Sequence, residues 1–373
     1  MRGKAAIVGF YETPSRKEFP DRSTNSLLAE VARGAIRDAG LRKDDIDGLI
    51  NAEGTNSLTL AEILGIRPRY TTSVTAHGAS GATSIGVAAQ AVSSGLANYV
   101  LCIFGGSQPR SSSRLRAMSQ AERPSGPASR ATEWEIPYGP VIAMNGWYGL
   151  IKQRHMFEYG TTMEQFAKCA ADERFNAAAN PNAIWFEQPV TVQDVLDSRF
   201  TNDPIHLLEG VMPVSGAHAV IVTTAERARA LPNPPVYILG VGGPATNHDV
   251  IWQEDNITVT PVTMSAPNAL QMAEMNVRDV QFAQFYDCYT VLVMACLEDA
   301  GIVPKGDIGP FYESTDTTFK GEFPINTDGG QIGAGQTAGL GGGFRHIVEA
   351  TRQIMGRAEN RQVEQSDVCL VNG

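Results

Sequence analysis

The sequence predicts an α/β protein made of two similar halves, and three observations support this prediction. Segments typical of buried strands alternate with segments typical of amphipathic helices, a pattern that favours parallel strands with helices on the sheet faces. Residues 36–50 (IRDAGLRKDDIDGLI) resemble residues 297–311 (LEDAGIVPKGDIGPF) with one inserted residue, which indicates an internal duplication. The 373 residues provide enough chain for about two or three units of ordinary domain size.

The first half supplies the clearest elements. Residues 4–10 (KAAIVGF) predict a buried strand, and residues 25–40 place an apolar face on a helix that stops at its final glycine. Residues 45–51 (DIDGLIN) predict a second strand. A turn at residues 75–84 (TAHGASGATS) leads into a helix, and residues 98–104 (NYVLCIF) predict the next strand. The turn stands where an α/β fold could present a nucleophile, yet none of its side chains is an obvious one.

The middle of the chain has a different amino-acid composition. Residues 108–201 are rich in Arg, Ser, Pro and Trp, and we expect them to form an insertion laid over the sheet. One helix is clear within it, at residues 161–179, where Thr161 and Glu164 have the spacing of a capping box.

The strand and helix rhythm then returns at residues 218–231, and the PNPP stretch at 232–235 is the best linker candidate. We therefore divide the chain into halves at 1–231 and 232–373. Two such halves packed face to face would place a site at their junction, near helix N-termini.

Composition excludes several classes of function. A net charge of −10 disfavours binding to nucleic acid or to anionic membranes, which depends on Lys and Arg. The first ten residues lack the features of a signal peptide or a membrane span, so a cytoplasmic location is expected. The odd number of cysteines and the absence of CxxC or HxxxH spacing argue against a disulfide framework and a structural zinc site. The five are Cys102, Cys169, Cys288, Cys296 and Cys369.

One local basic cluster could serve an anionic small molecule. It lies in a Ser/Pro-rich loop with few acids and comprises Arg110, Arg114, Arg116, Arg123 and Arg130. A solvated surface loop is the alternative interpretation of the same residues.

A glycine-rich run at residues 329–343 (GGQIGAGQTAGLGGG) almost spells a phosphate-binding P-loop. Gln336 stands where the P-loop lysine should be, so nucleotide hydrolysis is disfavoured, and the spacing of a dinucleotide fingerprint is also missing. Glycines here can still offer backbone N–H groups to an anion or oxyanion.

A polar cluster, Tyr286-Asp287-Cys288-Tyr289, follows a predicted strand and precedes an apolar helix. The carboxyl end of a strand is where α/β folds bind ligands. The alternative is structural: half-buried tyrosines with satisfied hydroxyls, and Asp287 as a helix cap.

As an ordered set, the duplicated halves, the turn at 75–84, the YDCY cluster and the run NTDGGQIGAGQTAG (326–339) resemble the thiolase superfamily, especially its sterol-carrier-protein or lipid-transfer-protein branch. The resemblance covers nearly the whole chain. It implies a duplicated five-layer α-β-α-β-α architecture with mixed sheets and an inserted loop domain.

The resemblance also places the family's catalytic motifs on this sequence. Gly78 stands where a thiolase has its acyl-accepting cysteine, in the stretch Gly78-Ala79-Ser80-Gly81, and Gln336 replaces the catalytic histidine. Tyr286 falls on the position that helps to form an oxyanion site. The family's second cysteine lies beyond the DVCLV strand, and the sequence stops at Gly373, so we expect that loop and the closing strand to be missing.

Covalent thiolysis needs a thiolate and a base, which Gly78 and Gln336 cannot supply. Cys288 and Cys296 remain, but the charge of Asp287 would disfavour a thiolate at Cys288. The resemblance instead implies retro-aldol cleavage of a β-hydroxyacyl-CoA, as in steroid side-chain degradation. That reaction needs a base for the β-hydroxyl proton and donors for the enolate oxygen.

Tyr286 is the leading proton-transfer residue. A free tyrosine has a pKa of ~10 and is a poor base at neutral pH, so either a neighbour lowers its pKa or the hydroxyl relays a proton. Tyr289, His77 and Asp287 are the neighbours expected to assist, although His77 can also be purely structural. Gln336 and the glycine N–H groups would donate to the enolate. The expected substrate and oxyanion contacts are Gly78, Ser80, Gly330 and Gly335, and the expected CoA contacts are Arg110, Arg114 and Arg116.

No cofactor is expected in the chain, and coenzyme A enters as part of the substrate. The resemblance implies a homodimer, enlarged to a heterotetramer by a small OB-fold, zinc-ribbon partner protein. A non-catalytic acyl-CoA-binding or scaffold subunit is the main alternative, and an acyltransferase is a minor one. A lysine Schiff base stays open at this stage.

Overall fold

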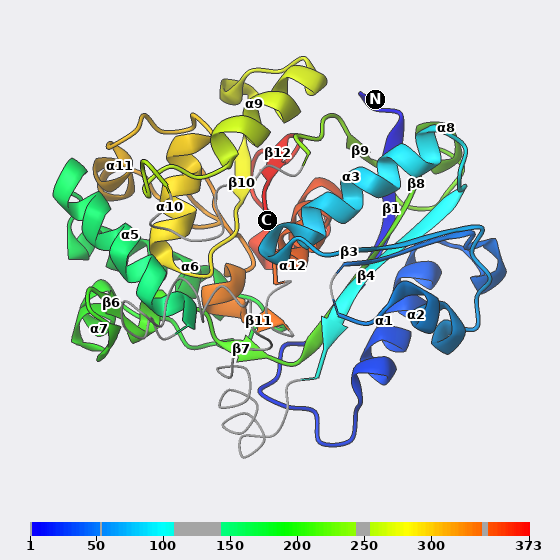
Figure 1. Ribbon diagram of the computed structural model, residues 1–373, viewed down its shortest axis with the longest axis horizontal. Helices are drawn as coiled ribbons and strands as arrows, with labels where there is room; N and C mark the ends of the chain where they lie inside the picture. Colours follow the sequence, from blue (N-terminus) through cyan, green and yellow to red (C-terminus); the bar gives the residue numbers. More distant parts are fainter. Residues whose placement is uncertain (1, 53, 108–142, 244–253, 338–341) are drawn as a thin grey trace, which may run out of the picture.

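The first half of the chain is built on a six-stranded mixed sheet with the order β3-β2-β4-β8-β1-β9 (Figure 1). The computed structural model describes residues 2–52, 54–107, 143–243, 254–337 and 342–373. Strand β2 runs parallel to β3 and β4, whereas β8 is antiparallel to β4 and β1, and β9 is antiparallel to β1. The strands are β1 (Ala5–Glu12), β2 (Gly48–Ala52), β3 (Tyr70–Val74), β4 (Tyr99–Gly106), β8 (Gly216–Thr224) and β9 (Val236–Ile238).

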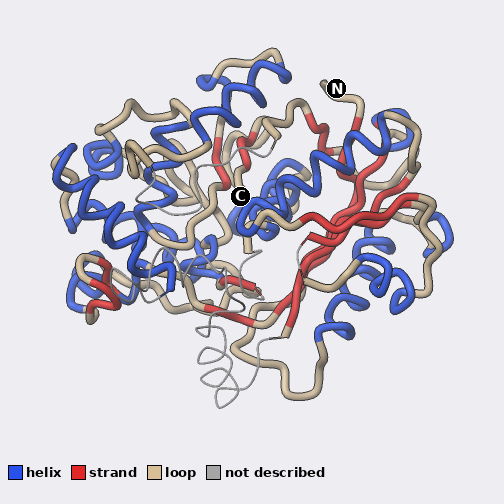
Figure 2. Tube along the Cα trace, in the orientation of Figure 1, coloured by secondary structure: helices blue, strands red, loops and turns tan. Residues whose placement is uncertain are grey.

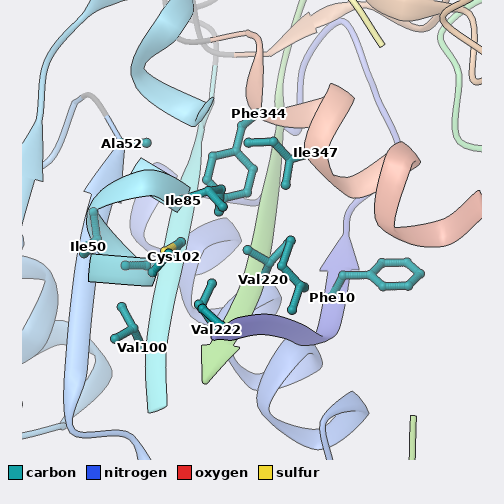
Figure 3. Packing of buried hydrophobic residues seen from close by; sticks show 14 of the residues in the cluster. Phe10, Ile50, Ala52, Ile85, Val100, Cys102, Val220, Val222, Phe344 and Ile347 are labelled. Carbon is teal, nitrogen blue, oxygen red and sulfur yellow. The ribbon is translucent and has the colours of Figure 1, made fainter. Parts of the chain in front are cut away.

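Helices cover both faces of this sheet. Helices α1 (Thr24–Asp38) and α2 (Ser57–Leu64) pack on one face, and α3 (Ser80–Ser93) and α12 (Phe344–Ile354) pack on the other. Figure 3 shows Phe344 and Ile347 of α12 directed at the same apolar layer as Ile85 of α3 and Val220 of β8. The sequence alternation predicted this arrangement, because strands that are buried on both faces are apolar at every position.

The second half is centred on a short parallel ladder of β10 (Phe282–Gln284) and β12 (Cys369–Val371). Helix α12 contacts this ladder as well as β1 and β8, so it lies between the two sheets. Figure 2 shows the two sheets as separate red segments with α12 between them. Outside the ladder lie α5 (Ala143–Tyr159), α6 (Met163–Ala178), α9 (Val262–Ala273), α10 (Thr290–Asp299) and α11 (Ile308–Ser314).

The mixed-sheet α/β prediction is confirmed, but the two halves have unequal sheets in the described part of the chain. The repeated Asp-Ile motif leads into β2 in the first half, whereas at Asp307 it leads into α11. Pro310 explains the difference, because proline has no N–H for a central strand yet fits the first turn of a helix.

One local prediction in the middle of the chain was wrong. The capping box of α6 joins Thr162 and Gln165, one residue later than expected. The described helices of the 108–201 insertion, α5 and α6, pack on α10 and α11 of the second half. Residues 108–142 lie outside the described residues, so the expected position of the insertion over the sheet stays a prediction. The boundary at 231/232 stays a prediction, although β9, which follows it, pairs with β1. Within the described ranges, no helix is long and apolar enough to cross a membrane.

Candidate active site

Tyr286 occupies the space that a side chain at position 78 would need. It follows β10, its backbone N–H donates to Asn372 Oδ1 at 2.7 Å, and its side chain is only 8% exposed. A Cβ atom placed on Gly78 would lie 2.6 Å from both Cε2 and Cζ of the Tyr286 ring. Carbon atoms need about 3.5–4.0 Å between them. The phenol ring therefore requires glycine at position 78.

Gln336 reaches the same phenol from the glycine-rich run. Residues Gly330–Ala334 form one turn of π-helix, and Gln336 and Thr337 then form β11, parallel to β7 (Pro213–Val214). The Gln336 backbone N–H donates to Met212 O at 2.8 Å. Its side-chain Nε2 donates to Tyr286 Oη at 3.4 Å. The two segments singled out from the sequence thus meet at one hydroxyl group.

The Asp287 carboxylate connects the YDCY cluster to the glycine-rich run by hydrogen bonds. It does not cap a helix, since the N-cap of α10 is Tyr289. Its Oδ2 accepts the backbone N–H groups of Gln331 at 2.7 Å and Ile332 at 3.1 Å. A Cβ on Gly330, which has φ of +57°, would lie 2.1 Å from the same oxygen. Asp287 is fully buried and its carboxylate is committed to these donors, so it positions the glycine-rich run and is not available as a base.

A buried acid and a buried imidazole adjoin Asp287. His346 Nε2 of α12 lies 3.0 Å from Asp287 Oδ1. Burial opposes ionisation of Asp287, but His346, Glu173 and the backbone N–H of Ile332 outweigh it and lower the pKa of the Asp287 carboxyl. Burial and the charge of Asp287 raise the pKa of Glu173 well above its usual value. Glu173 is thus the neutral member of this carboxyl pair.

Tyr286 is a neutral phenol in this environment. Burial first, and then Cys288 and Asp287, raise the pKa of Tyr286 well above its usual value, although Gln336 and Gln331 oppose the rise. The option that a neighbour lowers the pKa of Tyr286 was therefore wrong. The physical reason is burial of the hydroxyl group, which disfavours the charged phenolate. A neutral phenol can donate a proton or a hydrogen bond.

In residues 329–336, the first part of the glycine-rich run, the backbone N–H groups are not free as expected, and residues 338–341 of the run lie outside the described residues. Every backbone N–H from Gly329 to Gln336 donates to a protein acceptor, including Gly330 to Asp328 Oδ1 and Gly335 to Gln331 O. Gly330 and Gly335 therefore lack the free donors that the oxyanion role required. Their glycine identity serves close packing, because a Cβ on Gly335, which has φ of +107°, would lie 2.8 Å from Val214.

The structure gives the remaining predicted site residues different surroundings. Ser80 is fully buried, and its Oγ accepts the Ala76 N–H at 2.8 Å, so it shapes the turn. His77 has φ of +50° and an exposed side chain, and its catalytic role stays a prediction. Tyr289 packs on Tyr148 with ring centroids 4.7 Å apart, within the apolar cluster of the second half. The CoA-binding candidates Arg110, Arg114 and Arg116 lie outside the described residues.

The two nearby cysteines are inert thiols. Burial raises the pKa of Cys296 to about 12, and burial also raises that of Cys288, which the charge of Asp287 raises further. The predicted effect of Asp287 has the right sign, but burial contributes more. Neither thiol is a thiolate at neutral pH, so neither replaces the missing nucleophile.

Four residues of the site were missed from the sequence. Gln331 donates through Nε2 to Asp287 Oδ1 at 3.3 Å, and Asn372 fixes the Tyr286 backbone. Glu173 and His346 adjoin Asp287 from α6 and α12. Gln331 and Asn372 lie within segments already singled out, so their polar side chains in buried runs were a usable signal. Glu173 and His346 come from helices whose packing partners the sequence did not reveal.

Comparison with known proteins agrees with the predicted family and fold. Residues 5–205 match the family model described as "Thiolase, N-terminal domain", and residues 243–373 match "Thiolase C-terminal domain-like". A "Steroid side-chain-cleaving aldolase" from Thermomonospora curvata is 32% identical over 382 residues, which cover 100% of this chain and 96% of the relative. An "Acetyl-CoA acetyltransferase" from Methanothermobacter thermautotrophicus is 31% identical over 383 residues, covering 98% of this chain and 95% of the relative.

A solved structure described as "Ltp2-ChsH2(DUF35) aldolase" has a TM-score of 0.85 and 30% sequence identity, covering 97% of this chain and 92% of that chain. The predicted resemblance is thus confirmed at the level of family, fold and aldolase-type relatives. The chain belongs to the thiolase superfamily.

Proposed function

We propose that the protein is a carbon–carbon lyase that cleaves a β-hydroxyacyl-CoA thioester by a retro-aldol reaction. The observation that carries the proposal is the close approach of Gly78 and Tyr286: the phenol ring fills the space that any side chain at position 78, the expected position of the nucleophile, would need. This contact disfavours the acyl transfer named for the Methanothermobacter relative, because that chemistry needs an acyl-accepting group at this position. Retro-aldol cleavage needs no covalent acyl-enzyme.

In this reaction the β-hydroxyl loses its proton and the Cα–Cβ bond breaks. The bonding pair moves onto the α-carbon and thioester oxygen as an enolate, and a carbonyl forms at Cβ. As the bond breaks, the β-hydroxyl proton passes to the Tyr286 phenol oxygen while that phenol gives its own proton to the α-carbon, so the phenol is neutral before and after the reaction. The Gln336 amide carries two N–H groups, so it can donate to Tyr286 and to the enolate oxygen.

The finer features of the proposal rest on the relatives. Their names support a steroid or lipid-like acyl group, and the solved structure supports a small partner of the DUF35 type, which we equate with the expected OB-fold protein. Homodimer formation through a sheet edge is also proposed, and β3 is such an edge. Size measurement by light scattering, with and without the partner, tests both assemblies.

The test of activity is product analysis. The protein and its co-purified partner are incubated with a branched β-hydroxyacyl-CoA, and both products are quantified by mass spectrometry. The proposal predicts a ketone or aldehyde and a shortened acyl-CoA in equal amounts. Tight acyl-CoA binding without any cleavage would instead support the scaffold alternative, and a covalent acyl adduct on the protein would support acyl transfer.

A further inference from the structure

Lys152 of α5 is a lysine without solvent exposure. Burial lowers its pKa, and a buried lysine with a lowered pKa is a common Schiff-base nucleophile. Here, however, the ammonium is committed. Its Nζ donates to both carboxylate oxygens of Glu209 at 2.6 Å and to Pro204 O at 2.9 Å, which accounts for its three N–H groups.

Glu209 is equally buried and has further partners. Its carboxylate also accepts the Thr290 hydroxyl at 2.8 Å and the His206 backbone N–H at 3.0 Å. Thr290 is the first residue of α10 and directly follows the YDCY cluster. The ion pair with Lys152 thus fixes Glu209 against the base of the helix that begins beside the site.

Residues 209–214, which we call the strap, begin at this ion pair. They run between the segment that carries Tyr286 and the segment that carries Gln336. On one side, Gly210 forms a β-bridge with Tyr289, and the Val211 N–H donates to Cys288 O at 3.2 Å. On the other side, Met212 O accepts the Gln336 N–H at 2.8 Å, and β7 pairs with β11. Directly after β7, β8 begins in the first sheet. The strap therefore links the segment of Tyr286 to the segment of Gln336.

We propose that the Lys152–Glu209 ion pair positions the strap, and through it sets the separation of Tyr286 from Gln336, so that both residues are positioning residues for the reaction. This inference rests on the proposed lyase function. At 3.4 Å, the Gln336–Tyr286 contact is at the long end of a hydrogen bond, so a displacement of the strap by 1 Å would break it. Misplacement on this scale can reduce a rate by about 100-fold.

The main test is the double variant Lys152→Met/Glu209→Gln. It removes both charges together, because removing one partner would leave a buried unpaired charge. The matched control is Arg154→Met, which removes an ion pair with Glu158 on the exposed side of the same helix. The double variant is expected to lose about 10- to 100-fold in kcat, with KM changed by less than about threefold. The control should keep both parameters.

A second variant covers the case in which the double variant does not fold. A Cβ on Gly210 would lie 3.1 Å from Tyr289 Cε1, and φ of −113° at this residue accommodates alanine. Gly210→Ala should therefore shift the strap and lower kcat in the same way. In a Gln336→Leu background, either change should cost much less, because the contact that it misplaces is already absent. A merely structural role would give the same loss in both backgrounds.

Three results would overturn the inference. Unchanged kcat in a folded double variant would show that the pair serves stability only, and unchanged kcat in Gly210→Ala would show that the strap does not set the contact of Tyr286 with Gln336. A mass adduct on Lys152 after borohydride treatment with substrate would show that the lysine is a nucleophile. Absence of cleavage by the wild-type protein would refute the lyase function itself. Cleavage that is lost in Tyr286→Phe but fully kept in the strap variants would refute only this inference.

Discussion

Adding one methyl group at Gly78 tests whether glycine is needed at this position to leave room for the Tyr286 ring. The new Cβ would lie 2.6 Å from two ring atoms, and ordinary contact begins at 3.4 Å, so the ring has to move by the difference of 0.8 Å. Overpacking of this kind costs about 1–3 kcal/mol. A displacement of nearly 1 Å at a reacting group lowers the rate by about 100-fold. Gly78→Ala should therefore reduce stability moderately and kcat strongly.

The assay combines denaturant unfolding with steady-state cleavage of the β-hydroxyacyl-CoA. The control is the same substitution in a Tyr286→Ala background, where the ring is gone and the added methyl group has room. The destabilisation by Gly78→Ala should shrink there to within about 0.5 kcal/mol of zero, since the coupling of two contacting residues has been removed. A Gly78→Ala protein with normal kcat and normal stability would refute the reasoning, as would an equal cost in both backgrounds.

Three further predictions concern the buried groups of the site. Gly330→Ala should cost at least about 2 kcal/mol, because its positive φ and its contact with Asp287 both oppose a side chain; unchanged stability in an unfolding titration would contradict this. The lowered pKa of Asp287 stabilises the protein above the unfolded value of ~3.9, and this stabilisation is lost as pH falls through the folded pKa. The destabilisation caused by Asp287→Asn should thus be full at pH 7 and shrink below about pH 4, and a constant difference would disprove the assignment. Cys288 and Cys296 should resist iodoacetamide at pH 8 in the native state and react after unfolding, as followed by intact mass; rapid native labelling would contradict their inert character.

The fold was largely predictable from the pattern of apolar residues. Buried strands such as β1 and β4 are continuous apolar runs, and the helices between them show one apolar face, so both could be placed within a few residues. The pairing of strands into sheets was harder to predict, because it depends on contacts between segments that are distant in the sequence. The Asp-Ile repeat shows this limit: the same motif precedes a strand in one half and a helix in the other, where Pro310 fits the first turn of the helix.

The two residues that meet in the candidate site were singled out from the sequence, but the direction of the pKa shift of Tyr286 was not. Tyr286 and Gln336 were both singled out, and the structure brings them into contact. The raised pKa of Tyr286 could not be read from its neighbours in sequence, because it results mainly from burial in the folded chain. The role of Asp287 as a support for the glycine-rich run was missed for a similar reason. Its partners, the Gln331 and Ile332 N–H groups, follow it by more than forty residues.

The central claim is that the Tyr286 phenol performs the proton transfer in a site whose described residues offer no nucleophilic thiol. The most direct measurement is single-turnover cleavage by Tyr286→Phe, which keeps the ring against Gly78 and removes only the hydroxyl group. Tyr237→Phe, at a 41% exposed tyrosine on β9, is the matched control. The account predicts a loss of about 10²- to 10⁴-fold in the rate of Tyr286→Phe, with unchanged thermal stability and acyl-CoA binding. Cleavage by Tyr286→Phe at the rate of the control would contradict it.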